Sequence, residues 1–219
     1  MSIPVVEIRD VTDGLWLWRQ PHPDWNGQPD WEPEVASFAV ASGGARVLLD
    51  PLAPPPSARD AWDRLEAFTA DTVVILKPDH VRDVDLFVRW YGARALGPFL
   101  FWRDDIPKTE LEGVRAGDEL PGGLLALDDG RGMMETPVYL PEQGAIVFAD
   151  GLTAPGGELR VWASTLHTER VLPALRAMLE LPFEHVLVSH GEPVHTRADF
   201  EAALEREPYS EPEGYDPDR

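Results

Sequence analysis

The sequence contains no cysteine, and this absence restricts the chemistry that its side chains can supply. Disulfide bonds, thiolate metal ligands, iron–sulfur clusters and cysteine nucleophiles are all excluded. Any metal ion that the chain binds must therefore be held by histidine, aspartate or glutamate.

Basic residues are also scarce. Lysine occurs only at positions 77 and 108, and 19 lysines and arginines stand against 39 aspartates and glutamates, which leaves a formal net charge of −20. Binding of DNA, RNA or an acidic membrane begins with clustered lysines and arginines that neutralise phosphates. We therefore expect neither nucleic acid nor a membrane among the partners, and a small molecule as the ligand or substrate.

Long apolar runs are missing as well. No segment approaches the ~20 apolar residues of a membrane-spanning helix, and residues 1–10 carry acidic side chains where a signal peptide needs a basic start. These two absences predict a cytoplasmic protein. The GxSxG, GxGxxG and GxxxxGKS/T motifs are absent too, so serine hydrolases, dinucleotide enzymes and P-loop NTPases are not indicated.

The 219 residues suit one domain with a sizeable core, because domains usually contain roughly 50–250 residues. We predict a single domain over residues 1–205, followed at 206–219 by a solvated tail that is acidic and rich in proline. Short apolar or alternating runs predict strands at 14–18, 35–40, 46–50, 72–76, 94–102, 145–148 and 185–188, with two more between 119 and 139. Apolar residues at helical spacing predict helices over 57–68, from about Asp83 onward, and over 168–179.

Three of the predicted apolar strands end in ionisable residues. His80 and Asp83 follow the first of these strands, Asp150 the second and His190 the third. Open α/β sheets bind ligands beyond the carboxyl ends of their strands. If the three strands are neighbours, their ends converge, and this convergence is the main indication of a functional site in the sequence pattern.

The order of these features resembles a known superfamily from about residue 14 to residue 205. A strand ends in Asp50, a buried strand leads into the polar 77–83 loop, and two later strands end in Asp150-Gly151 and His190-Gly191. The metallo-β-lactamase superfamily has a similar order, with an HxHxDH metal motif in the loop, a metal-bridging aspartate and a last His-Gly. The resemblance implies an α/β fold, a four-layer αββα sandwich, with the site along one edge of its two sheets.

The 77–83 loop departs from the HxHxDH motif. Setting His80 on the second histidine places Pro78, Arg82 and Asp83 on the other three ligand positions. A shift of the register by one residue places Asp79 and Arg82 on the histidine positions instead, and the sequence leaves both registers open.

Two later positions match the superfamily and one does not. Asp150 matches the bridging carboxylate and His190 the last histidine, whereas the glycine–histidine turn of the superfamily falls on Gly130-Arg131. Arginine stays protonated in proteins and cannot serve as a ligand. A standard two-zinc centre is therefore not predicted.

A reduced metal site remains compatible with the sequence. Two imidazoles and two carboxylates, from His80, Asp83, Asp150 and His190, can hold one divalent ion, for which Zn²⁺, Mn²⁺ and Fe²⁺ are the candidates. Further polar residues are expected to complete or orient this pocket: Asp79, Glu135 and His22.

A site without any metal is the alternative. His80 then only hydrogen-bonds a turn, Asp83 only caps a helix, and Asp50 is a structural hydrogen-bond acceptor. Arg82 and Arg131 would grip a small anion where metals are bound in the superfamily, since guanidinium groups bind carboxylate and phosphate bidentately. Alternatively the two arginines would form a purely structural salt-bridge network, with Asp83, Asp150 or Glu135 as partners.

The resemblance implies a metal-dependent hydrolase of a small ester, lactone or thioester with a mononuclear site. The alternative is a non-catalytic protein whose cleft binds a small anion or is only structural. A third hypothesis is an interaction protein that uses its acidic tail and exposed tryptophans. Because members of the superfamily often form dimers, a homodimer is compatible with each of these functions.

Overall fold

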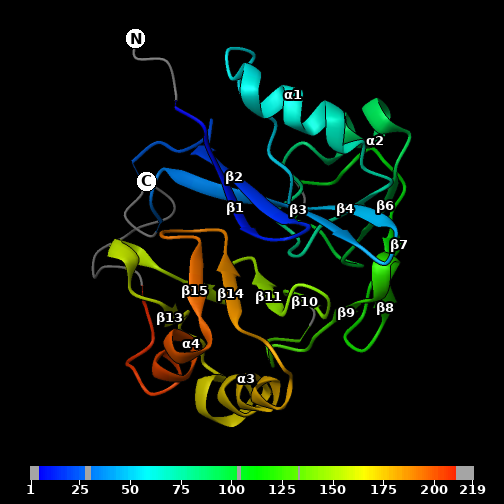
Figure 1. Ribbon diagram of the computed structural model, residues 1–219. Coiled ribbons are helices and arrows are strands. Elements are labelled where there is room, and N and C mark those ends of the chain that lie inside the picture. Colours follow the sequence, from blue (N-terminus) through cyan, green and yellow to red (C-terminus); the bar gives the residue numbers. More distant parts are fainter. Residues whose placement is uncertain (1–4, 28–30, 103–104, 133, 211–219) are drawn as a thin grey trace.

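The computed structural model describes residues 5–27, 31–102, 105–132 and 134–210, and this part of the chain forms two large β-sheets that pack face to face (Figure 1). In the first sheet, β1 to β4 form an antiparallel meander and β4 to β7 are parallel. Its strands, in spatial order, are β1 (Glu7–Thr12), β2 (Leu15–Pro21), β3 (Glu34–Ser42), β4 (Ala45–Leu49), β5 (Thr72–Val74), β6 (Arg94–Gly97) and β7 (Glu112–Gly113).

The second sheet is mixed, with β11 and β14 parallel and the other neighbours antiparallel. Its strands, in spatial order, are β15 (Val194–Thr196), β14 (His185–Val188), β11 (Ala145–Phe148), β10 (Val138–Leu140), β9 (Leu124–Ala126) and β8 (Glu119–Leu120). A separate small hairpin consists of β12 (Leu152–Thr153) and β13 (Arg160–Val161). Short 3₁₀ turns occur at Pro121–Gly123 and Pro155–Gly157.

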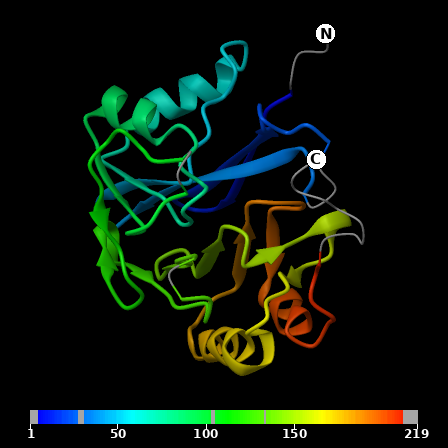
Figure 2. The same ribbon diagram turned by 180° about the vertical axis from the view of Figure 1, so that it is seen from behind.

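Helices cover the outer face of each sheet. Figure 1 shows α1 (Arg59–Phe68) and α2 (Val84–Tyr91) above the first sheet, and α3 (Leu172–Ala177) and α4 (Arg197–Ala203) below the second. The view from behind confirms that both sheets lie between these helix pairs (Figure 2). This is the predicted four-layer αββα sandwich.

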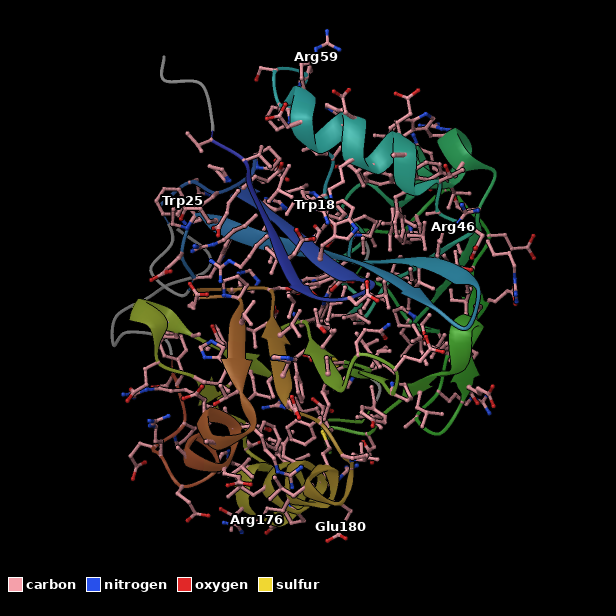
Figure 3. The ribbon with its side chains drawn as sticks, viewed as in Figure 1. Trp18, Trp25, Arg46, Arg59, Arg176 and Glu180 are labelled. Atoms are coloured by element: carbon pink, nitrogen blue, oxygen red, sulfur yellow. The ribbon has the colours of Figure 1, made fainter. Side chains whose placement is uncertain are left out.

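Because side chains alternate between the two faces of a strand, each sheet contributes to a core between the sheets and to an outer core beneath its own helices. In β2, Leu15 and Leu17 point between the sheets, whereas Trp16 and Trp18 pack beneath α1 and α2. Figure 3 shows Trp18 inside the molecule, and the charged side chains of Arg59 and Arg176 on the outer surface of the helices. Because each central strand is buried on both faces, its sequence is almost continuously apolar.

The predicted elements are largely present, with corrections at their ends. The strand expected over 94–102 stops at Gly97, because Pro98 lacks the N–H that a central strand needs. The helix expected over 168–179 consists of a π-helical turn (His167–Val171), α3 and a 3₁₀ turn (Met178–Glu180). The helix expected over 57–68 begins at Arg59, with Ala58 at its N-cap position. Helix α4 and five strands, namely β1, β7, β12, β13 and β15, were not predicted, and apart from the six-residue β1 these strands have only two or three residues. The segment over 119–139, for which two strands were predicted, contains three, β8, β9 and β10.

The segment expected to be a solvated tail from residue 206 is anchored at its start. Tyr209 forms a β-bridge with Trp162, and its backbone N–H donates to the Val161 carbonyl at 2.8 Å. The rest of that prediction, residues 211–219, lies outside the described residues. Within the described residues, no helix combines the length and apolar character needed to span a bilayer.

Candidate metal centre

Polar side chains from both sheets meet at the carboxyl ends of their strands. Asp50 follows β4, His80 lies in the loop after β5, Asp150 follows β11 and His190 follows β14. The pairs β4–β5 and β11–β14 are parallel, so each pair places its carboxyl ends at one edge. A β-bridge between Val35 and His190 joins the two edges. The strand ends therefore converge, as the sequence pattern predicts.

His80, Asp150 and His190 form the centre of the site. One oxygen of Asp150, Oδ1, lies 3.1 Å from Nε2 of His80 and 3.0 Å from Nε2 of His190. Both imidazoles are buried, and the side chain of Asp150 is 23% exposed. Each residue offers one ligand atom, and these three atoms lie within 4.8 Å of one another.

Asp50 orients the His80 ring. Its Oδ2 lies 2.8 Å from Nδ1 of His80, and its Oδ1 accepts the N–H of Leu76 at 2.7 Å. Asp50 is fully buried and has a left-handed backbone with φ of 44°, which aspartate tolerates better than most residues. A carboxylate on the far nitrogen of a histidine is the usual outer partner of a metal ligand.

A proton or a metal ion is needed between Nε2 of His80 and Oδ1 of Asp150, because both atoms are electron-pair donors. If Nδ1 of His80 donates its proton to Asp50, the Nε2 lone pair faces the Asp150 oxygen. Burial alone would lower the pKa of His80, but the charges of Asp150 and Asp50 outweigh it and raise the pKa to about 9. A metal-free His80 is therefore an imidazolium at neutral pH, and a bound metal ion would replace its Nε2 proton.

The other two members of the centre have the ionisation states that ligation needs. Burial lowers the pKa of His190, so this imidazole is neutral at neutral pH. Burial opposes ionisation of Asp150, yet His80 and Lys77 hold its pKa well below the usual range. A neutral imidazole and a carboxylate are the ligand forms of these side chains.

The donor set fits a single divalent ion. Oδ1 of Asp150 and Nδ1 of His190 are buried atoms without a regular hydrogen bond among the described residues. Two imidazole nitrogens and one carboxylate oxygen suit Zn²⁺ and also the 2-His-1-carboxylate sites of Fe²⁺ and Mn²⁺. With three protein ligands, a further position would stay open toward the pocket.

Asp83, predicted as a fourth ligand, lies elsewhere. Its Oδ2 accepts the N–H of Ala53 at 2.8 Å, and its own N–H donates to the carbonyl of Pro51. Asp83 occupies the N-cap position of α2, but its side chain bonds to this neighbouring loop instead of the helix. The residue therefore holds the segment after β4 in place, and it does not belong to the group of His80, Asp150 and His190.

The two arginines do not form the predicted network with Asp83, Asp150 or Glu135. Nη1 of Arg82 donates to the carbonyls of Ala36 and Asp50 at 2.8 and 2.7 Å. Arg131 pairs with the buried Asp129 at 2.8 Å and donates to the Trp162 carbonyl at 2.7 Å. Both guanidinium groups thus brace the main chain around the site, and both also line the pocket.

Glu135 supports the strand end that carries Asp150. Its two carboxylate oxygens accept the consecutive backbone N–H groups of Ala149, Asp150 and Gly151 at 2.9, 2.9 and 2.5 Å. Burial, with the nearby charges of Asp129 and Asp150, raises the pKa of Glu135 to about 7. Glu135 is therefore a positioning residue for Asp150.

A pocket of about 560 Å³ opens above the centre. His22 lies on its wall, where burial and then Arg82 lower its pKa to about 4, so its imidazole is neutral near pH 7. The ring of Trp31 contacts both His22 and His190 edge-on. Apolar side chains also line the pocket: Met134, Trp162 and Leu166.

Sequence reasoning overlooked Lys77, whose Nζ lies 2.7 Å from Oδ2 of Asp150 and 2.5 Å from Oδ2 of Asp79. Burial alone would lower the Lys77 pKa, but Asp150 and Asp79 reverse this effect and raise it, so the side chain is an ammonium. Its position directly after an apolar strand, in a chain with two lysines, was the available signal. Asp50 is the hydrogen-bond acceptor that was expected, and its acceptance of His80 adds a role in the site.

Comparison with known proteins identifies the fold. No family model and no curated protein matches the sequence. Among solved structures, the metallo-β-lactamase FIM-1 from Pseudomonas aeruginosa, in its mono-zinc form, matches with a TM-score of 0.67 and 18% identity, over 91% of this chain and 93% of that one. A metallo-β-lactamase from Pontibacter korlensis matches with a TM-score of 0.66 and 14% identity, over 93% and 100%.

A flavoprotein from Thermotoga maritima is also similar, with a TM-score of 0.65 and 15% identity over 94% of this chain. The match spans 61% of that longer chain. Identities this low demonstrate a shared fold and nothing finer. The chain has the metallo-β-lactamase fold, as the resemblance of its sequence features to that superfamily implies.

Proposed function

We propose that this chain, with its metallo-β-lactamase fold, is a hydrolase that uses one divalent metal ion to cleave a small ester, lactone or thioester. The observation that carries the proposal is the buried Oδ1 of Asp150, which lies about equally close to Nε2 of His80 and Nε2 of His190. The mono-zinc form of FIM-1 supports a single-ion site in this fold.

His80, Asp150 and His190 would hold the ion, and Asp50 would keep the His80 ring in the ligating orientation. Bound there, Zn²⁺, Mn²⁺ or Fe²⁺ supplies a Lewis acid and a water molecule of lowered pKa. The chain itself contributes Lys77 and Arg82, whose positive charges on the pocket wall favour the negative charge that develops on a carbonyl oxygen under attack.

The pocket restricts the substrate class. A cavity of about 560 Å³ accepts a small molecule and excludes a folded protein or a duplex. The wall formed by Trp31, Trp162 and Leu166 favours an apolar acyl group or ring, whereas the floor is ionic. A carbonyl compound with an apolar substituent can place its carbonyl group at the ionic floor and its substituent against the apolar side chains.

The experiment is elemental analysis of the purified protein after incubation with Zn²⁺, Mn²⁺ or Fe²⁺, followed by an ester, lactone and thioester screen. We expect about one equivalent of metal in the wild type, and loss of metal and activity in His80→Ala and His190→Ala. His185→Ala is the matched control, because His185 is a partly exposed histidine at the start of β14, the strand that His190 follows. Wild-type protein that stays metal-free would refute the proposal.

A second candidate is a metal-free pocket that binds a small anion. It is favoured by one observation, namely that Lys77, Arg82 and Arg131 all line the pocket of a chain with a net charge of −20. Titration of metal-free protein with small carboxylates and phosphate tests it. Binding that is lost in Arg82→Ala and absent from the metal-loaded protein would favour this candidate over the hydrolase.

A further inference from the structure

Lys77 is an unusual residue for the floor of a metal pocket. It is one of the two lysines in the sequence, its side chain is only 18% exposed, and it lines the pocket beside the centre. Its Nζ lies within 2.7 Å of both Oδ2 of Asp150 and Oδ2 of Asp79. A charged group at such a depth needs opposite charges around it, and these two carboxylates supply them.

The carboxylate of Asp150 therefore contacts a cation through one oxygen, and its other oxygen lies where the proposed metal ion would bind. Oδ1 faces the imidazoles of His80 and His190, while Oδ2 faces the ammonium of Lys77. A carboxylate whose two oxygens face different partners can bridge two positive charges. In this chain the Lys77 ammonium is one of these two charges.

We propose that the Lys77 ammonium takes the place of a second metal ion beside Asp150 and thereby makes the centre mononuclear. This inference rests on the proposed metal site. An ammonium has no lone pair, so Lys77 is not a ligand. Its charge repels a divalent ion at the Asp79 side of Asp150, and its stem fills the same space.

The arrangement also assigns a role to Asp79. Asp79 is held against Lys77 and stands outside the three-residue centre. Its carboxylate and Oδ2 of Asp150 converge on one point, which Nζ occupies. Removal of the lysine side chain would leave two carboxylates around an open space, which is a partial oxygen site for a second divalent ion.

The test compares Lys77→Ala and Lys77→Met with the wild type and with Lys108→Ala. Lys108 is the other lysine, is exposed and does not line the pocket, so Lys108→Ala changes the net charge by the same amount without altering the pocket. Bound Zn²⁺ and Co²⁺ are counted by elemental analysis after gel filtration, and the dissociation constant is measured by competition with a chromophoric chelator. Thermal unfolding verifies that each variant is folded.

We expect about one equivalent in the wild type and in Lys108→Ala, and about two in Lys77→Ala. Lys77→Met keeps the volume of the side chain but loses its charge, so it should bind the first ion at least ~10-fold more tightly. Folded Lys77 variants that bind one equivalent with wild-type affinity would overturn the inference and leave the proposed function intact. A wild type without metal would overturn both.

Discussion

Asp50 is not one of the three candidate metal ligands, yet the geometry of the site depends on it. It is fully buried in a left-handed backbone conformation, between the N–H of Leu76 and Nδ1 of His80. Its main-chain carbonyl accepts hydrogen bonds from Ser37 and Arg82. The residue therefore joins the end of β4 to the 77–83 loop and fixes the orientation of the His80 imidazole.

We predict that Asp50→Asn weakens metal binding. The amide keeps the shape of the side chain but removes the negative charge that stabilises the Nδ1 proton of His80, so metal affinity should fall by roughly 10–100-fold. Chelator competition measures this change. Asp71→Asn, at a half-exposed aspartate that pairs with Arg46, is the matched control. Unchanged affinity in folded Asp50→Asn would contradict the assigned role.

Single residues also explain why the predicted ligand set was partly wrong. Asp83 and His80 follow the same strand, and both are reasonable ligands on spacing alone. The chain adopts a left-handed conformation at Arg82, with φ of 44°, directly before Asp83, and Asp83 then bonds to Pro51 and Ala53. No propensity or periodicity indicates such a conformation at an arginine.

At the scale of elements, the short C-terminal helix α4 is stabilised by a capping box. The Thr196 hydroxyl accepts the N–H of Asp199, and the Asp199 carboxylate accepts the N–H of Thr196 at 2.9 Å. Phe200 and Ala203 bury one face of the helix against the second sheet. With seven residues, α4 depends on its cap and its packing more than on its intrinsic propensity.

We predict that Asp199→Ala lowers the free energy of unfolding by about 0.5–1 kcal/mol near neutral pH. The hydrogen bonds from Thr196 lower the pKa of Asp199 in the folded protein. Its contribution is therefore present above the unfolded pKa of about 3.9 and is lost as the pH falls through the folded value. Urea unfolding at several pH values measures the difference.

Glu201→Ala is the control for this prediction. Glu201 lies on the same helix and pairs with Arg197 on the surface, where an ion pair contributes little to stability. A loss in Asp199→Ala that is equally large at low pH would show that packing, and not the cap, is responsible. Equal losses in the two variants at neutral pH would lead to the same conclusion.

At the scale of the whole molecule, the two sheets share one core. Leu17, Phe38 and Leu49 of the first sheet pack with Val138 and Val147 of the second. The outer cores beneath the helices involve one sheet each. The site lies at the edge of the shared core, so its geometry requires both sheets to be folded and docked.

We predict that Phe38→Ala, at a fully buried side chain between the sheets, lowers the free energy of unfolding by about 3–5 kcal/mol in a single cooperative transition. Calorimetry and denaturant unfolding measure it. Phe99→Ala, at a side chain that is 47% exposed, should change stability far less. Two separate transitions would show that the sheets fold independently.

Most of the longer strands, and the polar residues that follow them, could be predicted from the sequence alone. Central strands that are buried on both faces must be apolar throughout, and a chain that leaves such a strand must become polar or turn. These local constraints predicted ionisable residues at the strand ends, which converge if the strands are neighbours, whereas the αββα sandwich was implied by the resemblance to the metallo-β-lactamase superfamily.

Which of these polar side chains contact one another became clear only from the folded structure. Asp83 and Lys77 both flank His80 in the sequence, yet Lys77 contacts Asp150 and Asp83 contacts Ala53. Arg131 pairs with Asp129 rather than with Asp150. Contact between side chains depends on backbone angles in the loops and on the docking of two sheets, and neither is encoded in periodicity or composition.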